Sequence, residues 1–201
     1  RETIRKALFL LLENGYIHKI QGKGSIVLDV HRFRLPVTGI LSFKERRQYQ
    51  DVEATTKVLV NKEVDAPDFL VRLGLVKPDE KLIYLVRQRI VDGEAVILDK
   101  DYIRKSTIGD LPTNRVEESL YEYLEKDLGI KISYGNKDFK IEPVNEEDTT
   151  YIDLNGHKHI AVLRSDVYTE GTDFLHYTES RHRVDKFYFS EFARRKSDRI
   201  N

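Results

Sequence analysis

Two arginines separated by a single residue offer the clearest chemistry in this sequence. Arg87 and Arg89 fall in the stretch Leu82 to Val91, whose apolar and β-branched residues predict a strand. Because side chains alternate along a strand, both arginines emerge from the face that also carries Ile83 and Leu85. A charge on an apolar face must be paired or must bind an anion. Two guanidinium groups suit a phosphate, since each presents parallel N–H donors to its oxygens.

A second interpretation of the same arginines is structural. Asp99 and Asp101 lie on the next predicted strand, Ala95 to Tyr102, and could form salt bridges with both of them. The two interpretations are compatible, because a carboxylate that pairs with an arginine can also accept sugar hydroxyls. The sequence leaves both open.

The loop from Thr38 to Phe43 is a second candidate anion site. Gly39 allows a ligand to approach the backbone closely, and Ser42 adds a hydroxyl and a backbone N–H where a helix could begin. Such a loop is more often a simple connector, so this pattern alone does not decide the matter.

The polar segment from Tyr177 to Arg183 is a third candidate. A run of polar and charged residues at the end of a strand is commonly a solvated edge. Glu179 and Arg181 share a strand face, however, and could orient the hydroxyls of a ligand.

These candidate sites could bind a ligand without reaction, or they could belong to an enzyme. In an enzyme, Glu179 or Asp99 would act as a general acid or base. The sequence supplies no activated nucleophile, no metal-ligand spacing and no phosphate-binding glycine motif. His157 and His159, beside a glycine turn, are more typical of surface residues than of metal ligands. We therefore expect no catalytic residue, no metal and no cofactor.

The composition is that of a globular protein. Charged residues make up 34% and hydrophobic residues 40% of 201 residues, enough for one full domain and part of another. No apolar run is long enough for a membrane span, and no signal peptide is visible. The absence of cysteine excludes disulfides and is typical of a reducing compartment, so we expect a cytoplasmic protein.

The first 27 residues predict a helix followed by a β-hairpin. The helix is indicated by apolar residues at helical spacing and by a glycine stop: Ile4, Ala7, Leu8, Leu11, Leu12 and Gly15. Residues 16–20 and 25–27 predict the two strands, joined by a glycine-rich cationic tip. An ordinary surface helix and hairpin would give the same periodicity.

The charge of this segment favours a nucleic-acid contact. Its charged residues are Arg1, Arg5, Lys6, Lys19 and Lys23 against Glu2 and Glu13. The whole chain balances 34 basic against 34 acidic residues, so the basic excess is local. A local basic excess is typical of a surface that contacts nucleic acid.

The pattern R-E-T-I-R-K-A-L…N-G-Y-I…Q-G-K-G-S-I-V resembles the recognition helix and wing of the GntR-family bacterial transcription regulators. The resemblance implies DNA contacts by Arg1, Thr3, Arg5 and Lys6, and a wing tip at Gly22 and Lys23. A winged helix needs two further helices before the recognition helix. We therefore expect residues 1–30 to be the C-terminal part of such a domain, and the chain to be a fragment of a longer protein.

Residues 31–201 predict an α+β domain with an antiparallel sheet, because hairpins alternate with helices. A connector is expected over 30–36, followed by a helix that begins at Asp65-Ala-Pro67 and ends at Gly74. A hairpin turn is expected at Asp92-Gly93, and a second helix is capped by Asn114 and Glu117 and ends at Gly129. The remaining expected elements are a strand pair within 132–141, a short helix capped by Asn145, and strands over 160–168 and 174–182.

Four segments of this domain resemble the effector-binding domain called UTRA, of the HutC subfamily: T-G-I-L-S-F, R-Q-R-I-V-D-G-E-A-V-I-L-D, E-S-L-Y-E-Y-L and H-Y-T-E-S-R-H-R-V-D-K-F. The resemblance covers residues 36–192 and implies a small antiparallel sheet with helices, akin to chorismate lyase. It also implies a regulator that binds a palindromic operator as a homodimer and senses a small sugar phosphate.

Site residues follow from this resemblance. The phosphate is expected at Leu41, Ser42, Phe43, Arg87 and Arg89. The sugar is expected at Asp99, Ser119, Tyr121, His176, Glu179 and His182. Amino-sugar sensors have a glutamate and a tyrosine in the last strand where this chain has His176 and His182, which disfavours an amino-sugar ligand.

Overall fold

The computed structural model describes residues 2–13, 16–20, 22–28, 43–44 and 53–187. It divides into two compact units, one formed by residues 1–39 with 189–201 and the other by residues 40–188. The connector predicted over residues 30–36, and the domain boundary predicted between residues 30 and 31, lie outside the described residues.

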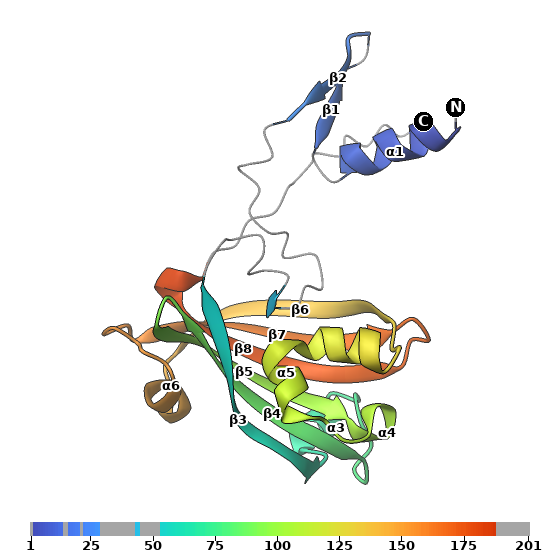
Figure 1. The fold of residues 1–201 in the computed structure, drawn as a ribbon. Coiled ribbons are helices and arrows are strands. Elements are labelled where there is room, and N and C mark those ends of the chain that lie inside the picture. Colours follow the sequence, from blue (N-terminus) through green and yellow to red (C-terminus); the bar gives the residue numbers. More distant parts are fainter. Residues whose placement is uncertain (1, 14–15, 21, 29–42, 45–52, 188–201) are drawn as a thin grey trace. The chain divides into compact units, whose positions relative to one another are not determined.

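The N-terminal unit contains the predicted helix and hairpin (Figure 1). Helix α1 spans Glu2–Glu13, and strands β1 (Ile17–Ile20) and β2 (Gly24–Val27) pair antiparallel. Gly22 and Gly24 have φ values of 80° and 94°, a backbone conformation that favours glycine. The glycines of the tip are therefore required by the turn itself.

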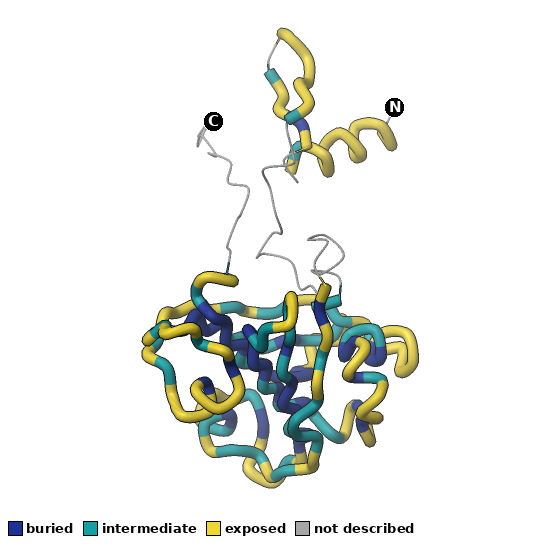
Figure 2. Tube along the Cα trace, turned by 60° about the vertical axis from the view of Figure 1, so that its left-hand side comes forward, coloured by how far each residue is buried: buried dark blue, intermediate teal, exposed yellow. Residues whose placement is uncertain are grey.

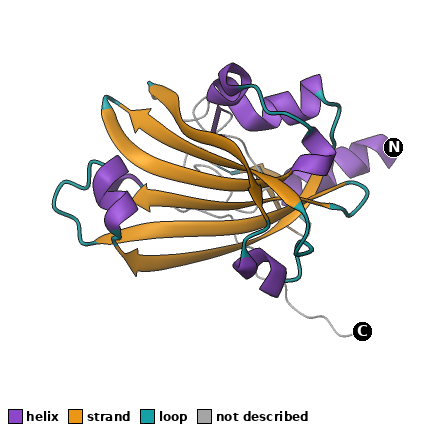
Figure 3. Ribbon diagram, turned by 90° about the horizontal axis from the view of Figure 1, so that it is seen from below, coloured by secondary structure: helices purple, strands orange, loops and turns teal. Residues whose placement is uncertain are grey.

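The second unit is built on one antiparallel sheet with the strand order β3-β4-β5-β8-β7-β6. Its strands are β3 (Ala54–Asp65), β4 (Lys81–Val91), β5 (Glu94–Arg104), β6 (Ile132–Pro143), β7 (His159–Thr169) and β8 (Phe174–Arg183). Figure 3 shows them as a single layer with helices packed beside it. The predicted α+β class with an antiparallel sheet is confirmed.

One turn sets the register that matters most for the site. Asp92 and Gly93 have φ values of 51° and 82°, so both central residues of the β4–β5 turn are left-handed, as a two-residue hairpin requires. The resulting register places Arg87 directly opposite Asp99. The prediction of a hairpin at this dipeptide is confirmed.

The region 132–141 was predicted as a strand pair and is instead part of one long strand, β6. Gly135 and Asn136 lie inside this strand, where they pair with Val167 and Asp166 of β7. The Asn136 side chain also donates a hydrogen bond of 2.7 Å to the Asp166 carboxylate. Pairing with β7 thus continues through the middle of this region, where two separate strands would need a turn.

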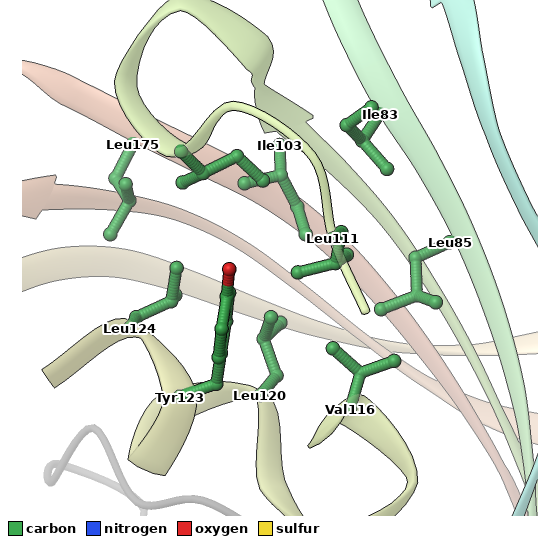
Figure 4. Close-up of a cluster of buried hydrophobic side chains, with 10 residues drawn as sticks. Ile83, Leu85, Ile103, Leu111, Val116, Leu120, Tyr123, Leu124 and Leu175 are labelled. Carbon is green, nitrogen blue, oxygen red and sulfur yellow. The ribbon is translucent and has the colours of Figure 1, made fainter. Parts of the chain in front are cut away.

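Helices α4 (Lys105–Ile108), α5 (Thr113–Glu122) and the π-helical turn η2 (Tyr123–Asp127) pack on the sheet face that carries the arginines. Figure 4 shows Leu120 and Leu124 pointing toward Leu85 and Ile103 of the sheet. Each fully buried leucine contributes about 2 kcal/mol relative to exposure. Figure 2 shows buried residues running through the strands beneath these helices. This hydrophobic cluster fixes α5 above the sheet.

Helix α5 begins differently from its prediction. The expected cap at Asn114 and Glu117 is wrong, because Pro112 occupies the N-cap position and makes no side-chain cap bond. Asn61 of β3 instead donates to the Leu111 carbonyl at 2.7 Å and contacts the Thr113 hydroxyl at 3.1 Å. A partner on a distant strand thus holds the start of this helix.

Helices α3 (Asp68–Arg72) and α6 (Glu146–Tyr151) pack on the opposite face. Helix α3 follows Pro67 and precedes Gly74 as predicted, but Pro67 takes the N-cap position rather than the first turn. The predicted cap of α6 is confirmed, because the Asn145 side chain and the Asp148 carboxylate each accept the other's backbone N–H at 2.9 Å. This reciprocal pair satisfies two donors at the start of a short helix.

A buried ion pair ties α6 to the sheet. Arg181 of β8 donates from Nε and Nη2 to the two oxygens of Asp148, at 2.6 and 2.8 Å. Asp148 is fully buried, so its charge is compensated by this bidentate contact and by the capping bond.

We expect Asp148→Ala to lower the free energy of unfolding by about 3 kcal/mol, because it leaves the buried Arg181 charge without its main partner. Urea denaturation followed by circular dichroism measures the change. Glu147→Ala is the matched control on the same helix. It removes a half-exposed partner of Lys100 and should change stability little. Equal effects of the two substitutions would contradict the assignment.

Candidate functional site

Arg87 and Arg89 are buried side by side and paired with carboxylates. Arg87 Nη2 lies 2.7 Å from Asp101 Oδ2, and Arg89 Nε lies 2.8 Å from Asp99 Oδ2. Arg89 Nη1 also donates to the Thr56 hydroxyl of β3 at 2.6 Å. The predicted salt bridges are confirmed, and the anion-binding interpretation remains compatible with them.

The strand register extends this row of charges onto β8. Ser180 stands opposite Asp99, His182 opposite Ile97, and His176 opposite Ile103. Because directly opposed residues share a sheet face, these three β8 residues lie on the same face as the arginines. Strand β8 thus brings side chains to this row that lie 75 residues or more beyond Asp101 in the sequence.

Two parallel chains of polar groups result. In one, the Ser180 hydroxyl donates to Asp99 Oδ1 and lies 2.8 Å from His182 Nε2. In the other, His176 Nδ1 lies 3.7 Å from Asp101 Oδ1. Each chain runs from an arginine through an aspartate to a histidine.

A break in helix α5 contributes two more residues. Ser119 has φ −169° and ψ 119°, which is extended backbone inside the helix, and its side chain is buried. Just beyond it, the Tyr121 hydroxyl lies 3.2 Å from His176 Nε2. The interruption therefore brings helix α5 into contact with the polar row of the sheet.

Aromatic rings border this row at two places. Arg89 Cζ lies 4.6 Å from the centre of the Phe43 ring, a cation–π contact. At the other end, the Phe187 ring meets His182 edge-on at 5.2 Å and stacks on Phe139 at 4.8 Å. Phe43 is thus beside the arginines, as the resemblance implied, whereas Leu41 and Ser42 lie outside the described residues.

Burial and mutual attraction set the charges of the site. Burial, with the nearby Arg87 charge, lowers the pKa of Arg89 to about 10, so it is still protonated at neutral pH. Burial alone would raise the pKa of Asp99, but Arg89, Arg87 and the Ser180 hydroxyl hold it well below its usual range. The Arg89–Asp99 pair is therefore fully charged.

His176 is neutral at physiological pH. Its burial, reinforced by the Arg87 charge and only partly offset by Asp101, lowers its pKa to about 4. A neutral imidazole provides one donor and one acceptor nitrogen, which suits the recognition of hydroxyl groups.

Two buried nitrogens of this row have no hydrogen-bond partner among the described residues: Arg87 Nε and His176 Nδ1. Arg87 and His176 both neighbour Asp101. Buried polar atoms are nearly always hydrogen-bonded, so an orphaned pair at one place makes this position a candidate for ligand binding. Two groups that flank a carboxylate can bind a ligand that carries both acceptor and donor oxygens.

Glu179, expected among the sugar-binding residues, is not brought together with the others. It stands opposite Lys100 and therefore on the other face of β8. There it pairs with Lys100 Nζ at 3.0 Å and with Arg164 at 2.8 Å. Burial alone would raise the pKa of Glu179, but these cations hold it below its usual value. Glu179 thus belongs to the ion-pair network beside α6.

Four members of the site were not predicted from the sequence: Thr56, Phe139, Ser180 and Phe187. Asp101 was predicted only as a salt-bridge partner. Ser180 could have been found, because it alternates in phase with His176 and His182. Thr56 carried no signal, since strand β3 itself was not predicted.

The predicted DNA-contacting residues lie on the N-terminal unit. Thr3, Arg5 and Lys6 are exposed on α1. Gly22 and Lys23 form the hairpin turn, where Lys23 N donates to the Ile20 carbonyl at 3.1 Å. Arg1 lies outside the described residues.

The described part of the chain lacks two further kinds of feature, a cluster of metal ligands and a membrane-spanning helix. It contains no cluster of three or more histidine, cysteine, aspartate or glutamate residues that could hold a metal. None of its helices is both long and apolar enough to cross a membrane. His157 Nε2 lies 3.7 Å from Asp185 Oδ1.

Comparison with known proteins decides the family. The family model described as the UTRA domain matches residues 49–188. This chain belongs to the UTRA-domain family. It is 46% identical over 197 residues to the HTH-type transcriptional regulator TreR of Bacillus subtilis (strain 168). The match covers 97% of this chain and 82% of that protein.

Solved structures agree with this assignment. The B. subtilis trehalose repressor (TreR) effector binding domain superposes with a TM-score of 0.65 at 39% identity, covering 71% of this chain and 99% of that one. The possible transcriptional regulator YydK from B. subtilis superposes with a TM-score of 0.76 at 22% identity. The match covers 96% of this chain and 83% of that one, and at this identity it shows the fold alone.

The chain is therefore a GntR-type regulator with a UTRA domain, and the resemblance found in the sequence is confirmed. Its relatives are named transcriptional regulators or repressors, which indicates a regulatory protein rather than an enzyme.

The low pKa of His176 predicts a pH dependence of stability. The unfolded chain takes up the proton near pH 6.5, whereas the folded UTRA domain takes it up only near pH 4. Between these values the unfolded state binds more protons, so the free energy of unfolding falls as the pH falls, by up to about 1.4 kcal/mol per pH unit.

Urea denaturation from pH 7 to pH 4 measures this slope, with His176→Gln as the variant that lacks the proton site. The wild-type curve should fall more steeply than that of the variant. Parallel curves would show that His176 is not held neutral.

Proposed function

We propose that this chain is part of a bacterial repressor of a trehalose uptake or utilisation operon, released from its operator when it binds trehalose 6-phosphate. The observation that carries the proposal is the buried Arg87/Arg89 pair with its orphaned Arg87 Nε. The relationship to the B. subtilis trehalose repressor supports the choice of sugar. The segments V-I-L-D-K-D-Y and Y-T-E-S-R-H-R-V-D-K-F, which resemble trehalose operon repressors, support it as well.

The phosphate binds between the two guanidinium groups. Arg87 and Arg89 keep N–H donors that their aspartates do not engage, and Phe43 lies beside Arg89. Leu41 and Ser42, which lie outside the described residues, are expected to add backbone and hydroxyl donors. Arginine suits this role because its planar fork matches the geometry of phosphate oxygens.

The sugar hydroxyls are recognised by the polar row beyond the arginines: Asp99, Ser119, Tyr121, His176 and His182, joined by Asp101 and Ser180. These side chains offer both acceptors and donors, as hydroxyl groups require. Glu179 takes no part, because it faces the α6 network. Histidines at 176 and 182 make an amino-sugar phosphate the weaker alternative.

The regulatory mechanism is thermodynamic linkage. A homodimer places two recognition helices in successive major grooves of a palindromic operator, through Arg1, Thr3, Arg5 and Lys6, with Gly22 and Lys23 at the wing tip. The effector releases DNA only by favouring a conformation that misaligns these helices. By reciprocity, operator DNA weakens effector binding by the same factor.

Calorimetric titration of the chain tests the ligand. We expect micromolar binding of trehalose 6-phosphate, and a large loss for trehalose because the arginine contacts are absent. Glucosamine 6-phosphate should bind weakly. Binding of another sugar phosphate alone would keep the regulator and exclude trehalose 6-phosphate as its effector.

Arg87→Lys tests the phosphate clamp while keeping a cation for Asp101. Loss of the planar fork should weaken trehalose 6-phosphate binding by about thirtyfold or more, equivalent to about 2 kcal/mol. Arg72→Lys, the same substitution at an exposed position of α3, should leave the affinity unchanged.

In the full-length repressor, Arg87→Lys and the more severe Arg87→Ala should bind operator normally yet resist release by the effector. Electrophoretic mobility shift with added trehalose 6-phosphate measures this. Normal release from DNA by either variant would exclude Arg87 as a phosphate ligand.

A further inference from the structure

Phe43 and Lys44 are adjacent in the chain and contact two different elements of the UTRA domain. Arg89 Cζ of β4 lies over the Phe43 ring, 4.6 Å from its centre. The Lys44 ammonium group forms an ion pair with Glu122, the last residue of α5. Phe43 was expected at the site from the sequence, whereas Lys44 and Glu122 were not.

Glu122 is held in place by its neighbours in the sequence. Its backbone N–H donates to the Ser119 hydroxyl at 3.3 Å, just after the break in α5. Leu120 and Leu124, on either side of it, are buried in the hydrophobic cluster that fixes α5 and η2 on the sheet. A side chain that extends from such a fixed backbone can anchor a segment that lies 78 residues away in the sequence.

The contact between Lys44 and Glu122 is ionic. Glu122 accepts hydrogen bonds from Lys44 through Oε2 and from Lys126 through Oε1, the second at 2.7 Å. The bonds from Lys126 and Lys44 lower the pKa of Glu122 to about 2, so its carboxylate is ionised at neutral pH. The side chains of Lys44 and Glu122 are 37% and 24% exposed, so their ion pair contributes little to the stability of the fold. Its main effect is on the position of residue 44, and hence of Phe43 beside it.

Phe43 completes a set of three contacts that hold the Arg89 guanidinium. Arg89 Nε donates to Asp99 at 2.8 Å, and Nη1 donates to the Thr56 hydroxyl at 2.6 Å. The cation–π contact with Phe43 is the third. A guanidinium held by three contacts has little freedom to turn, so the N–H groups that remain point in a defined direction, as phosphate recognition requires.

We propose that Glu122 is a positioning residue that holds the Phe43 ring against Arg89 through the ion pair with Lys44, and thereby orients Arg89 for the phosphate of the effector. Glu122 acts through Lys44 and Phe43 and does not itself contact the ligand. The part of this inference that concerns the phosphate rests on the proposed function, whereas the anchoring of Phe43 does not.

Helix α5 then serves both ends of the proposed site. Ser119 and Tyr121 belong to the part that recognises the sugar, and the Tyr121 hydroxyl contacts His176 at 3.2 Å. Glu122, the next residue, controls the phosphate end through Lys44. The geometry of one short stretch of helix thus sets the relative positions of the groups that bind the two parts of the ligand, which is the preorganisation that selective binding needs.

Nitrogen-15 NMR of the arginine side chains tests the anchor without any ligand. The ring current of Phe43 shifts the Arg89 Nε–H signal, and Phe43→Leu shows the position of that signal without the ring. Glu122→Ala should move the signal toward this position, and Lys44→Ala should have the same effect. A signal that keeps its wild-type position in both variants would overturn the proposal.

Two further variants separate the anchor from a general effect on α5. Lys126→Ala removes the other cation that contacts Glu122 and should leave the Arg89 signal unchanged. Exchange of the two charges, in the double variant Glu122→Lys with Lys44→Glu, should restore the wild-type position. A shift in Lys126→Ala as large as that in Glu122→Ala, or no recovery in the double variant, would exclude the ion pair as the cause.

Effector titration separates this inference from the proposed function. Glu122→Ala and Lys44→Ala should each weaken trehalose 6-phosphate binding about fivefold, comparable to the loss of one cation–π contact. Lys126→Ala should bind like the wild type, and the charge exchange should restore the affinity. If the wild-type chain ignores trehalose 6-phosphate while the Arg89 signal responds as expected, the effector assignment fails and the anchoring of Phe43 stands. Full affinity in Glu122→Ala would refute its role in binding.

Discussion

The structure of the UTRA domain depends on the compensation of four charges buried at the centre of its sheet. The side chains of Arg87 and Arg89 must lie on this face of β4, because Ile83 and Leu85 on the same face are part of the core under α5. Their charges are therefore matched by Asp101 and Asp99 on the neighbouring strand. Removing one partner of such a pair leaves an uncompensated buried charge. This destabilises the fold more than replacing both partners by apolar residues would. The register of β4 and β5 thus maintains both the fold and the site.

Strand β8 extends this constraint in two directions. Residues 176, 180 and 182 face the arginines, whereas Glu179 and Arg181 face the network that holds α6. A shift of one residue would exchange the two sets and leave both groups of charges unpaired. The dense polar sequence of this strand is therefore explained by two separate sets of partners, one on each face of the sheet.

Local rules in the sequence were sufficient for parts of this arrangement. Alternation placed Arg87 and Arg89 on one face, and Asp92-Gly93 and Asn145 indicated a turn and a cap that the structure contains. The same alternation, applied to β8, would have separated Glu179 from His182. Strand β3 had no comparable signal, because it is an edge strand whose exposed and half-buried residues form no apolar pattern. The break at Ser119 also could not be predicted from neighbouring residues, since the contact that follows it, between Tyr121 and His176, joins residues 55 apart in the sequence.

The paired arginines also determine how an anion can be bound. Two guanidinium groups and two carboxylates leave the centre of the site without net charge, so long-range attraction contributes little to the binding of a phosphate. Affinity must come instead from N–H groups that the aspartates do not engage, at short range and with defined directions. Inorganic phosphate could use only these, whereas a sugar phosphate adds hydroxyl contacts to the histidines and carboxylates. A neutral site of this kind would discriminate by the shape and hydroxyl pattern of a ligand more than by its charge, which fits the proposed sensing of one sugar phosphate among many.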